Sequence, residues 1–230
     1  RHTAKGPVSK SVRLGFSPPS SYRREIRAAD GTLERLIVSD GKIERSYDPS
    51  RKIVREGEVA DPLYKRLGPD EELERLEENY ETSVVFGPDV AGRPTWLLEL
   101  RPRAEGRARR RLWVDRKNGL VIKSESYRLD ETIASVMRFD RLTLGKSEAA
   151  VDLRIPAPAG VRMVERLEPD YLALEEARSV SGMEARVPSW LPPGYAFESL
   201  DVIRRGRNAV LHSRFSDGVE VLSLFQCPPR

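Results

Sequence analysis

The chain has 230 residues, of which 39% are hydrophobic and 33% are charged. This length suits one large domain or two small ones, and the apolar fraction is enough for modest hydrophobic cores. No apolar stretch approaches the roughly 18 residues that a transmembrane helix needs, so we predict no membrane-spanning segment. The net charge of +4 is a small excess over nearly balanced acidic and basic residues. The basic cluster over residues 101–117 is accompanied by neither an RRM aromatic motif nor a helix-turn-helix pattern, so we predict no nucleic-acid partner.

The scarcity of cysteine and histidine excludes several kinds of chemistry. Cys227 is the only cysteine, so neither an intrachain disulfide nor a cysteine-based zinc site can form. The sequence contains no glycine-rich phosphate loop and no Gly-x-Ser-x-Gly nucleophile elbow. His212 is the only histidine inside an expected element, and its neighbours in sequence look structural. We therefore predict a protein that is not an enzyme and has no metal and no cofactor.

The first part of the chain has the pattern of short antiparallel strands. Apolar residues alternate at Val12, Leu14 and Phe16, before two prolines break the run at residues 17–20. From Tyr22 onward, the dipeptides at residues 30–31 and 40–41 are Asp-Gly, which supplies the positive φ angles of hairpin turns. The segment from Pro69 to about Tyr80 differs, because its apolar residues recur at helical spacing behind an acidic first turn. It predicts a short surface helix.

The most regular strand pattern follows this helix. A strand at residues 84–86 is expected to end in a turn at Gly87-Pro88. Further strands are expected near residue 96 and over residues 107–115, 120–129 and 133–144, with Asn118-Gly119 as the clearest hairpin turn. Such short connections predict an antiparallel meander. Alternation places Trp96, Leu98 and Leu100 on one face, and it sets Trp113 opposite its neighbours in sequence.

A change of pattern near residue 155 predicts a second domain. Residues 155–160 read Ile-Pro-Ala-Pro-Ala-Gly, which indicates a linker. Beyond it, Asp170 is placed to cap a helix over residues 171–180 that ends at Gly182. Three strands are expected at residues 196–204, 208–215 and 219–226, which together with the helix make a small α+β unit.

Two stretches of the sequence resemble a known family. The first comprises Arg111-Leu112-Trp113-Val114-Asp115, Gly119-Leu120, Lys123-Ser124-Glu125 and Met137-Arg138-Phe139. It is similar to the strand–hairpin–strand core of LolA/LolB-type lipoprotein carriers, and closer still to the large domain of MucB/RseB proteins. The second comprises Trp190-Leu191-Pro192-Pro193-Gly194-Tyr195, Phe215-Ser216-Asp217-Gly218-Val219 and Leu222-Ser223-Leu224-Phe225. It resembles the small C-terminal domain of MucB/RseB proteins.

This resemblance implies a fold and a role. The fold class is α+β, mostly antiparallel β. A LolA-like half-open β-barrel, incomplete at its N-terminus, is expected over residues 1–155, and a small C-terminal domain, short at its C-terminus, over residues 161–230. The implied role is to bind the periplasmic part of a membrane anti-sigma factor, shield it from proteolysis and modulate envelope-stress signalling, with lipid-like ligands as releasing signals. A lipid or lipoprotein carrier of the periplasm or other envelope compartment is the alternative function.

Two sets of residues are the candidate sites. The ligand-binding candidates are Trp96, Leu98, Leu100, Arg109, Arg111, Trp113, Ile122 and Phe139. In a half-open barrel, part of such an apolar surface must be covered by helices, by a lipid or by a partner, whereas in a closed barrel it fills the core. The arginines are either a solvated row or a binding site for anionic headgroups. The partner-binding candidates are Trp190, Tyr195, Phe215 and Phe225, whose other interpretation is the core of the small domain.

Overall fold

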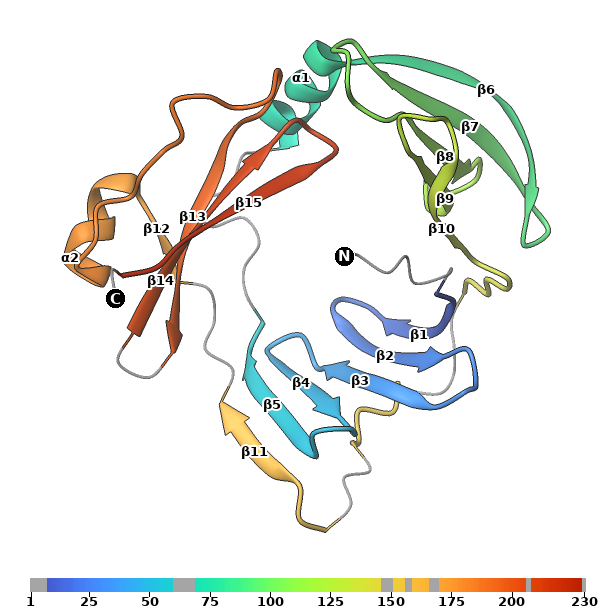
Figure 1. The fold of residues 1–230 in the computed structure, drawn as a ribbon. Helices are drawn as coiled ribbons and strands as arrows, with labels where there is room; N and C mark the ends of the chain where they lie inside the picture. Colours follow the sequence, from blue (N-terminus) through green and yellow to red (C-terminus); the bar gives the residue numbers. More distant parts are fainter. Residues whose placement is uncertain are drawn as a thin grey trace. The chain divides into compact units, whose positions relative to one another are not determined.

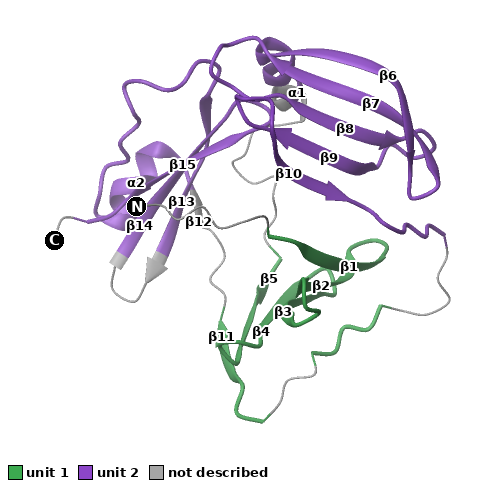
Figure 2. Ribbon diagram, turned by 45° about the vertical axis from the view of Figure 1, so that its right-hand side comes forward, with its two compact units in different colours: residues 1–62, 146–170 green, residues 63–145, 171–230 purple. Residues whose placement is uncertain are grey.

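The computed structural model describes residues 8–59, 69–145, 151–155, 159–165, 170–205 and 208–228. Within these ranges the chain forms three β-sheets and short helical segments (Figure 1). It divides into two compact units: residues 1–62 with 146–170, and residues 63–145 with 171–230 (Figure 2). Among the described residues, no helix is long and apolar enough to cross a membrane.

The first unit holds one six-stranded sheet. Its strands are β1 (Lys10–Ser17), β2 (Ser21–Ala28), β3 (Leu33–Ser39), β4 (Ile43–Asp48), β5 (Ile53–Glu58) and β11 (Arg162–Glu165), in that order across the sheet. Neighbours pair antiparallel except β5 and β11, which are parallel. Both Asp-Gly turns are confirmed, with φ angles of 84° at Gly31 and 94° at Gly41. Leu36, Val38 and Val54 form the centre of this unit's core.

The second unit opens with helix α1 (Pro69–Asn79) and a five-stranded antiparallel meander. The strands are β6 (Tyr80–Val90), β7 (Arg93–Pro102), β8 (Arg110–Asp115), β9 (Val121–Tyr127) and β10 (Ile133–Arg138). The predicted helix, meander and Asn118-Gly119 turn are thus confirmed. In this turn Gly119 has a φ of 75°, and the Asn118 side chain accepts a hydrogen bond of 3.0 Å from the Leu120 amide.

The turn predicted at Gly87-Pro88 is wrong, because β6 continues to Val90. β6 is an edge strand, where a proline without an amide hydrogen is tolerated, and the pairing with β7 is irregular between Gly87 and Val90. The Pro88 carbonyl accepts a 2.8 Å hydrogen bond from the Thr95 hydroxyl. A Cβ at residue 87 would lie 2.5 Å from that hydroxyl oxygen, so the glycine permits close strand approach rather than chain reversal.

The C-terminal part of the second unit is a four-stranded sheet in the order β12 (Asp170–Leu172), β13 (Ala196–Arg205), β14 (Asn208–Ser216) and β15 (Val221–Gln226). The three predicted strands are confirmed. The helix predicted over residues 171–180 is partly wrong, because residues 170–172 form a strand and helical structure begins later. A 3-10 turn (Leu174–Glu176) leads into α2 (Ala177–Ser181), which ends at Gly182 as expected, with a φ of 75°. Leu172 is 6% exposed in this sheet's core.

Both sheets of the second unit meet at a buried carboxylate, Asp217. Its Oδ2 atom accepts hydrogen bonds of 2.8 Å from the Tyr80 hydroxyl and 2.6 Å from Arg107. Its backbone carbonyl accepts one from the Asn79 side chain at 3.1 Å, and Asn79 also donates to the Gly194 carbonyl. Burial and the neighbouring Asp217 raise the pKa of Tyr80. The C-terminal sheet is therefore joined to the end of α1 and the start of β6 by named polar contacts.

The fold is mostly antiparallel β, as predicted, and none of the three sheets closes into a barrel within the described ranges. The compact units do not follow the predicted boundary at residues 155–160. β11 lies beyond that boundary and pairs with β5, while β6 to β10 group with the C-terminal sheet. Part of the predicted linker, residues 156–158, lies outside the described residues. The division into two domains, residues 1–155 and 161–230, stays a prediction.

Candidate binding surfaces

The β6–β10 sheet has one mainly apolar face. Residues directly opposite each other in an antiparallel pair point to the same side. Trp96 lies opposite both Phe86 and Val114, and Leu98 lies opposite Val84 and Leu112. A shallow pocket of about 270 Å³ on this face is lined by Val84, Trp96, Leu98 and Val114.

Exposure changes along the apolar face. Leu100 on β7 is 2% exposed and Ile122 on β9 is fully buried, so these two side chains serve as core. Toward the β6–β7 hairpin, the exposed fraction rises to 36% at Trp96 and 70% at Phe86. These two rings stack with their centres 4.7 Å apart, and the Arg116 guanidinium lies 4.9 Å from one centre and 5.0 Å from the other. The open end of the face is thus an aromatic pair with a cation stacked beside it, which places an apolar surface next to a positive charge.

The opposite face of the same sheet is charged and centred on Glu99. One Glu99 oxygen accepts hydrogen bonds from Arg109 at 2.7 Å and Arg111 at 2.9 Å, and the other accepts from Arg101 at 2.9 Å. Burial acts to raise the pKa of Glu99, but hydrogen bonds from these three arginines outweigh it and hold the pKa below its usual value. Glu99 therefore stays ionised and fixes three guanidinium groups side by side.

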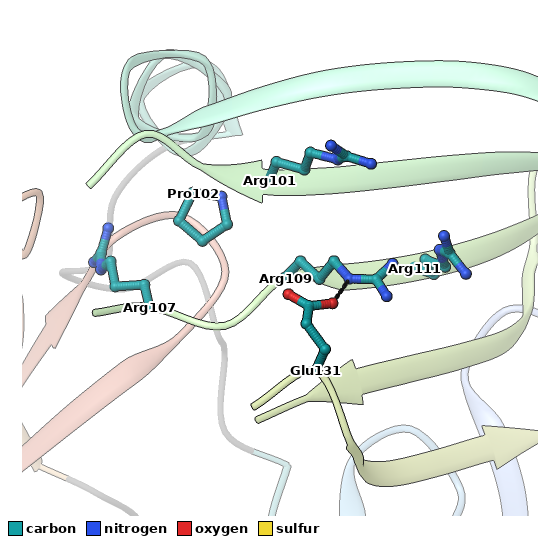
Figure 3. Close-up of a pocket in the computed structure, with 6 residues that line it drawn as sticks. All are labelled: Arg101, Pro102, Arg107, Arg109, Arg111 and Glu131. Carbon is teal, nitrogen blue, oxygen red and sulfur yellow. Dashed lines mark hydrogen bonds and ion pairs between the residues drawn. The ribbon is translucent and has the colours of Figure 1, made fainter. Parts of the chain in front are cut away.

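A second pocket of about 410 Å³ opens over these guanidinium groups (Figure 3). Arg109 is one of its lining residues, and its guanidinium carbon lies 3.9 Å from the centre of the Tyr127 ring. Arg109 also pairs with Glu131, which lies in the turn between β9 and β10. The lining residues are Arg101, Pro102, Arg107, Arg109, Arg111 and Glu131. This arginine pocket is suited to an oxyanion, because guanidinium groups recognise carboxylate and phosphate oxygens in pairs.

The structure divides the predicted ligand-binding residues between the two faces. Trp96, Leu98, Leu100 and Ile122 belong to the apolar face, although Leu100 and Ile122 are buried. Arg111 and Trp113 lie on the charged face, where the Lys123 ammonium is 3.9 Å from the centre of the Trp113 ring.

Arg109 and Phe139 lie just outside the strands. Arg109 precedes β8 and joins the arginine pocket. Phe139 follows β10, and its amide donates a 2.9 Å hydrogen bond to the Ile122 carbonyl. Sequence reasoning missed Phe86 and Glu131. It counted Arg116 only as one member of the basic cluster, although its position after Asp115 sets it apart from the arginine pocket.

The predicted partner-binding residues have different environments. Phe215 is fully buried and packs edge-on against Phe197, so in this structure its side chain is unavailable to a partner. Tyr195 lies under Arg107, with the guanidinium carbon 4.7 Å from its ring centre. Trp190 is 73% exposed and Phe225 is 56% exposed. Of the four, Trp190 and Phe225 are therefore the most exposed, and Tyr195 is half-buried.

One polar arrangement in the C-terminal sheet has the residue types of a hydrolase. His212 Nδ1 lies 2.9 Å from an Asp201 oxygen, and its Nε2 lies 3.0 Å from the Ser223 hydroxyl. The three residues come from β13, β14 and β15. The Phe225 ring stacks on the imidazole with the ring centres 4.4 Å apart. Neither of the two pockets described above includes these residues.

Comparisons with known proteins agree on one family. The model of the MucB/RseB N-terminal domain matches residues 22–159, more than half of the chain. No curated protein sequence matches the chain. The structure of the Pseudomonas aeruginosa MucA/MucB complex is 22% identical, with a TM-score of 0.57, and the match covers 95% of this chain and 69% of that one.

Two further structures are similar to the same extent. MucB in complex with MucA(peri) is 22% identical with a TM-score of 0.57, over 96% of this chain and 69% of that one. A structure of MucB is 21% identical with a TM-score of 0.53, over 95% and 68%. At this identity the likeness shows a shared fold.

Proposed function

The chain belongs to the MucB/RseB family, and from this membership we propose that it is an extracytoplasmic regulatory protein that binds the periplasmic part of an anti-sigma factor. Such binding would modulate envelope-stress sigma-factor signalling. The observation that carries the proposal is the family match over residues 22–159, extended by the fold shared with MucB over nearly the whole chain. Two of those MucB structures are complexes with MucA.

The exposed aromatic residues support a protein-binding role. Large rings such as Trp and Phe anchor protein interfaces when a partner covers them. Phe86 and Trp190 are each at least 70% exposed, which leaves most of both rings in contact with water. Phe86 lies beside Arg116, so a partner at this position meets both an apolar and a cationic contact.

Binding is testable with the extracytoplasmic part of a single-span anti-sigma factor from the same organism. We expect the purified fragment to bind the wild-type chain in an interferometry assay and to become resistant to limited proteolysis in the complex. Phe86→Ala and Trp190→Ala should each weaken binding, by about tenfold if the ring is an anchor. Leu129→Ala, which shortens another exposed apolar side chain, is the control. A correctly folded wild-type chain that neither binds nor protects the fragment would contradict the proposal.

A lipid or lipoprotein carrier is a second candidate function, supported by the shallow apolar pocket at Val84, Trp96, Leu98 and Val114. Covering such a surface with an acyl chain stabilises by about 25 cal/mol per Å² of apolar area. The predicted anionic-headgroup partners Arg109 and Arg111 lie on the other face, whereas Arg116 lies beside Trp96. A lipid in this pocket would therefore place its headgroup near Arg116.

A pair of substitutions on β7 tests lipid binding. Leu98→Asp puts a carboxylate in the apolar pocket, whereas Leu97→Asp puts one on the opposite face of the same strand. A fluorescent fatty-acid probe should bind wild type and Leu97→Asp alike and lose at least about tenfold in affinity with Leu98→Asp, because a buried unpaired carboxylate is costly. Circular dichroism checks that both variants are folded. Equal probe binding by both folded variants would remove the lipid role.

A further inference from the structure

The arginine pocket carries more positive charge than its own carboxylates neutralise. Three guanidinium groups, those of Arg101, Arg109 and Arg111, surround Glu99, whose side chain is only 12% exposed. The remaining carboxylate at the pocket is Glu131, whose side chain is 64% exposed. Glu99 is held in place by three partners, so it keeps the guanidinium groups together whether or not Glu131 is present.

Glu131 has the features of a replaceable occupant. It belongs to the turn between β9 and β10 and reaches the pocket from outside the sheet, as Figure 3 shows. Its ionic contact is with Arg109, and an ion pair with so exposed a partner contributes little net stability. Arg109 would keep its bond to Glu99 if Glu131 swung away. The pocket therefore already accommodates one glutamate side chain, and the molecule loses little by exchanging it for another.

We propose that the arginine pocket binds an acidic side chain of a protein partner, and that Glu131 is the intramolecular carboxylate that this side chain displaces. A glutamate in this position would accept the hydrogen bond that Arg109 now donates to Glu131. The pocket lies on the face opposite the apolar pocket, so the acidic contact is independent of any lipid there. The inference rests on the proposed function only in assuming a protein partner.

A short peptide tests the pocket without the natural partner. The probe is a fluorescein-labelled peptide of alternating glutamate and glycine, compared with its glutamine counterpart at fixed ionic strength by fluorescence anisotropy. Glu131→Gln should bind the acidic peptide about threefold or more tighter, because the internal competitor is removed. Arg101→Gln and Arg109→Gln should weaken it by about tenfold, the effect of losing one charge-assisted hydrogen bond. Arg101 is well exposed, so its variant is expected to fold even if Arg109→Gln does not.

Two controls separate the pocket from general electrostatics. Glu105→Gln removes an acidic charge from the exposed β7–β8 loop, and Lys117→Gln removes a basic charge at the far end of β8. Tightening by Glu105→Gln equal to that by Glu131→Gln would overturn the proposal, as would weakening by Lys117→Gln equal to that by Arg101→Gln.

Inorganic phosphate is the third probe. Phosphate binding that Glu131→Gln tightens, without peptide binding, would identify a small-oxyanion site and also overturn the proposal. Peptide binding without anti-sigma-factor binding would contradict only the proposed function.

Discussion

His212 lies within hydrogen-bonding distance of both Asp201 and Ser223, yet we interpret these three side chains as structural. Acyl transfer by a serine needs hydrogen-bond donors for the developing oxyanion and a cavity that holds the substrate. Here the serine belongs to a regular strand, one face of the imidazole is covered by Phe225, and neither described pocket reaches the hydroxyl. The contacts have a structural explanation, because a buried Asp201 carboxylate without a hydrogen-bond partner would lower the stability of the fold.

This interpretation predicts that Ser223 is not an activated nucleophile. A fluorophosphonate probe, which labels serines activated by a histidine, should leave the protein unmodified after prolonged incubation, as measured by mass spectrometry of the intact chain. His212→Gln should retain the wild-type fold, since an amide preserves hydrogen bonding toward Asp201 and Ser223. Labelling that disappears in both Ser223→Ala and His212→Gln would show a functional hydrolase site, and the prediction of a non-catalytic protein would then be wrong.

At the scale of elements, the sequence predicts turns well where the chemistry is local. Asp-Gly and Asn-Gly turns depend on a positive φ and on a side chain that bonds its own backbone, and both are visible in the sequence. The Gly87-Pro88 dipeptide misled the prediction because its role depends on β7. Only the pairing with Thr95 makes the glycine a point of close strand approach. The sequence likewise predicts a cap and first turn of a helix at residues 170–172, but they form strand β12, in which Leu172 is buried.

The candidate surfaces were predictable from the sequence only where alternation within one strand determines them. Alternation within β7 placed Trp96 and Leu98 on one face without knowledge of the structure. The register between β7 and β8 then decides which arginines accompany them, and this register sets Arg111 opposite Glu99 rather than beside Leu98. Glu131 reaches Arg109 from 22 residues away through a hairpin turn. No local sequence pattern around Arg109 or Glu131 indicates that contact, so the arginine pocket could not be predicted from the sequence.

At the scale of the whole molecule, the second unit depends on a carboxylate that connects distant parts of the chain. Asp217 follows β14, yet its partners Tyr80 and Arg107 come from β6 and from the β7–β8 loop, 137 and 110 residues away in sequence. Its other oxygen accepts the amides of Val219 at 2.8 Å and Glu220 at 2.7 Å, which forms the β14–β15 turn. The same residue therefore shapes a local hairpin and joins two sheets, so the loss of its charge should affect both.

Asp217→Asn should accordingly destabilise the folded chain strongly. The Asp217 side chain is 1% exposed and that of Arg107 is 11% exposed, so the substitution leaves a nearly buried guanidinium without its counter-charge. Breaking such a pair costs about 3 kcal/mol of unfolding free energy, whereas Tyr80→Phe, which deletes one hydrogen bond, should cost about 1 kcal/mol. Urea unfolding followed by tryptophan fluorescence measures both.

The matched control is Asp140→Asn. Asp140 forms an ion pair with Arg138, and the two side chains are 81% and 66% exposed, so the substitution should change the unfolding free energy by less than about 0.5 kcal/mol. If Asp217→Asn unfolds at the same urea concentration as this control, the buried carboxylate does not hold the two sheets together. The expected larger loss for Asp217→Asn than for Tyr80→Phe would assign most of the coupling to the ion pair with Arg107, because Tyr80→Phe removes only the tyrosine hydrogen bond.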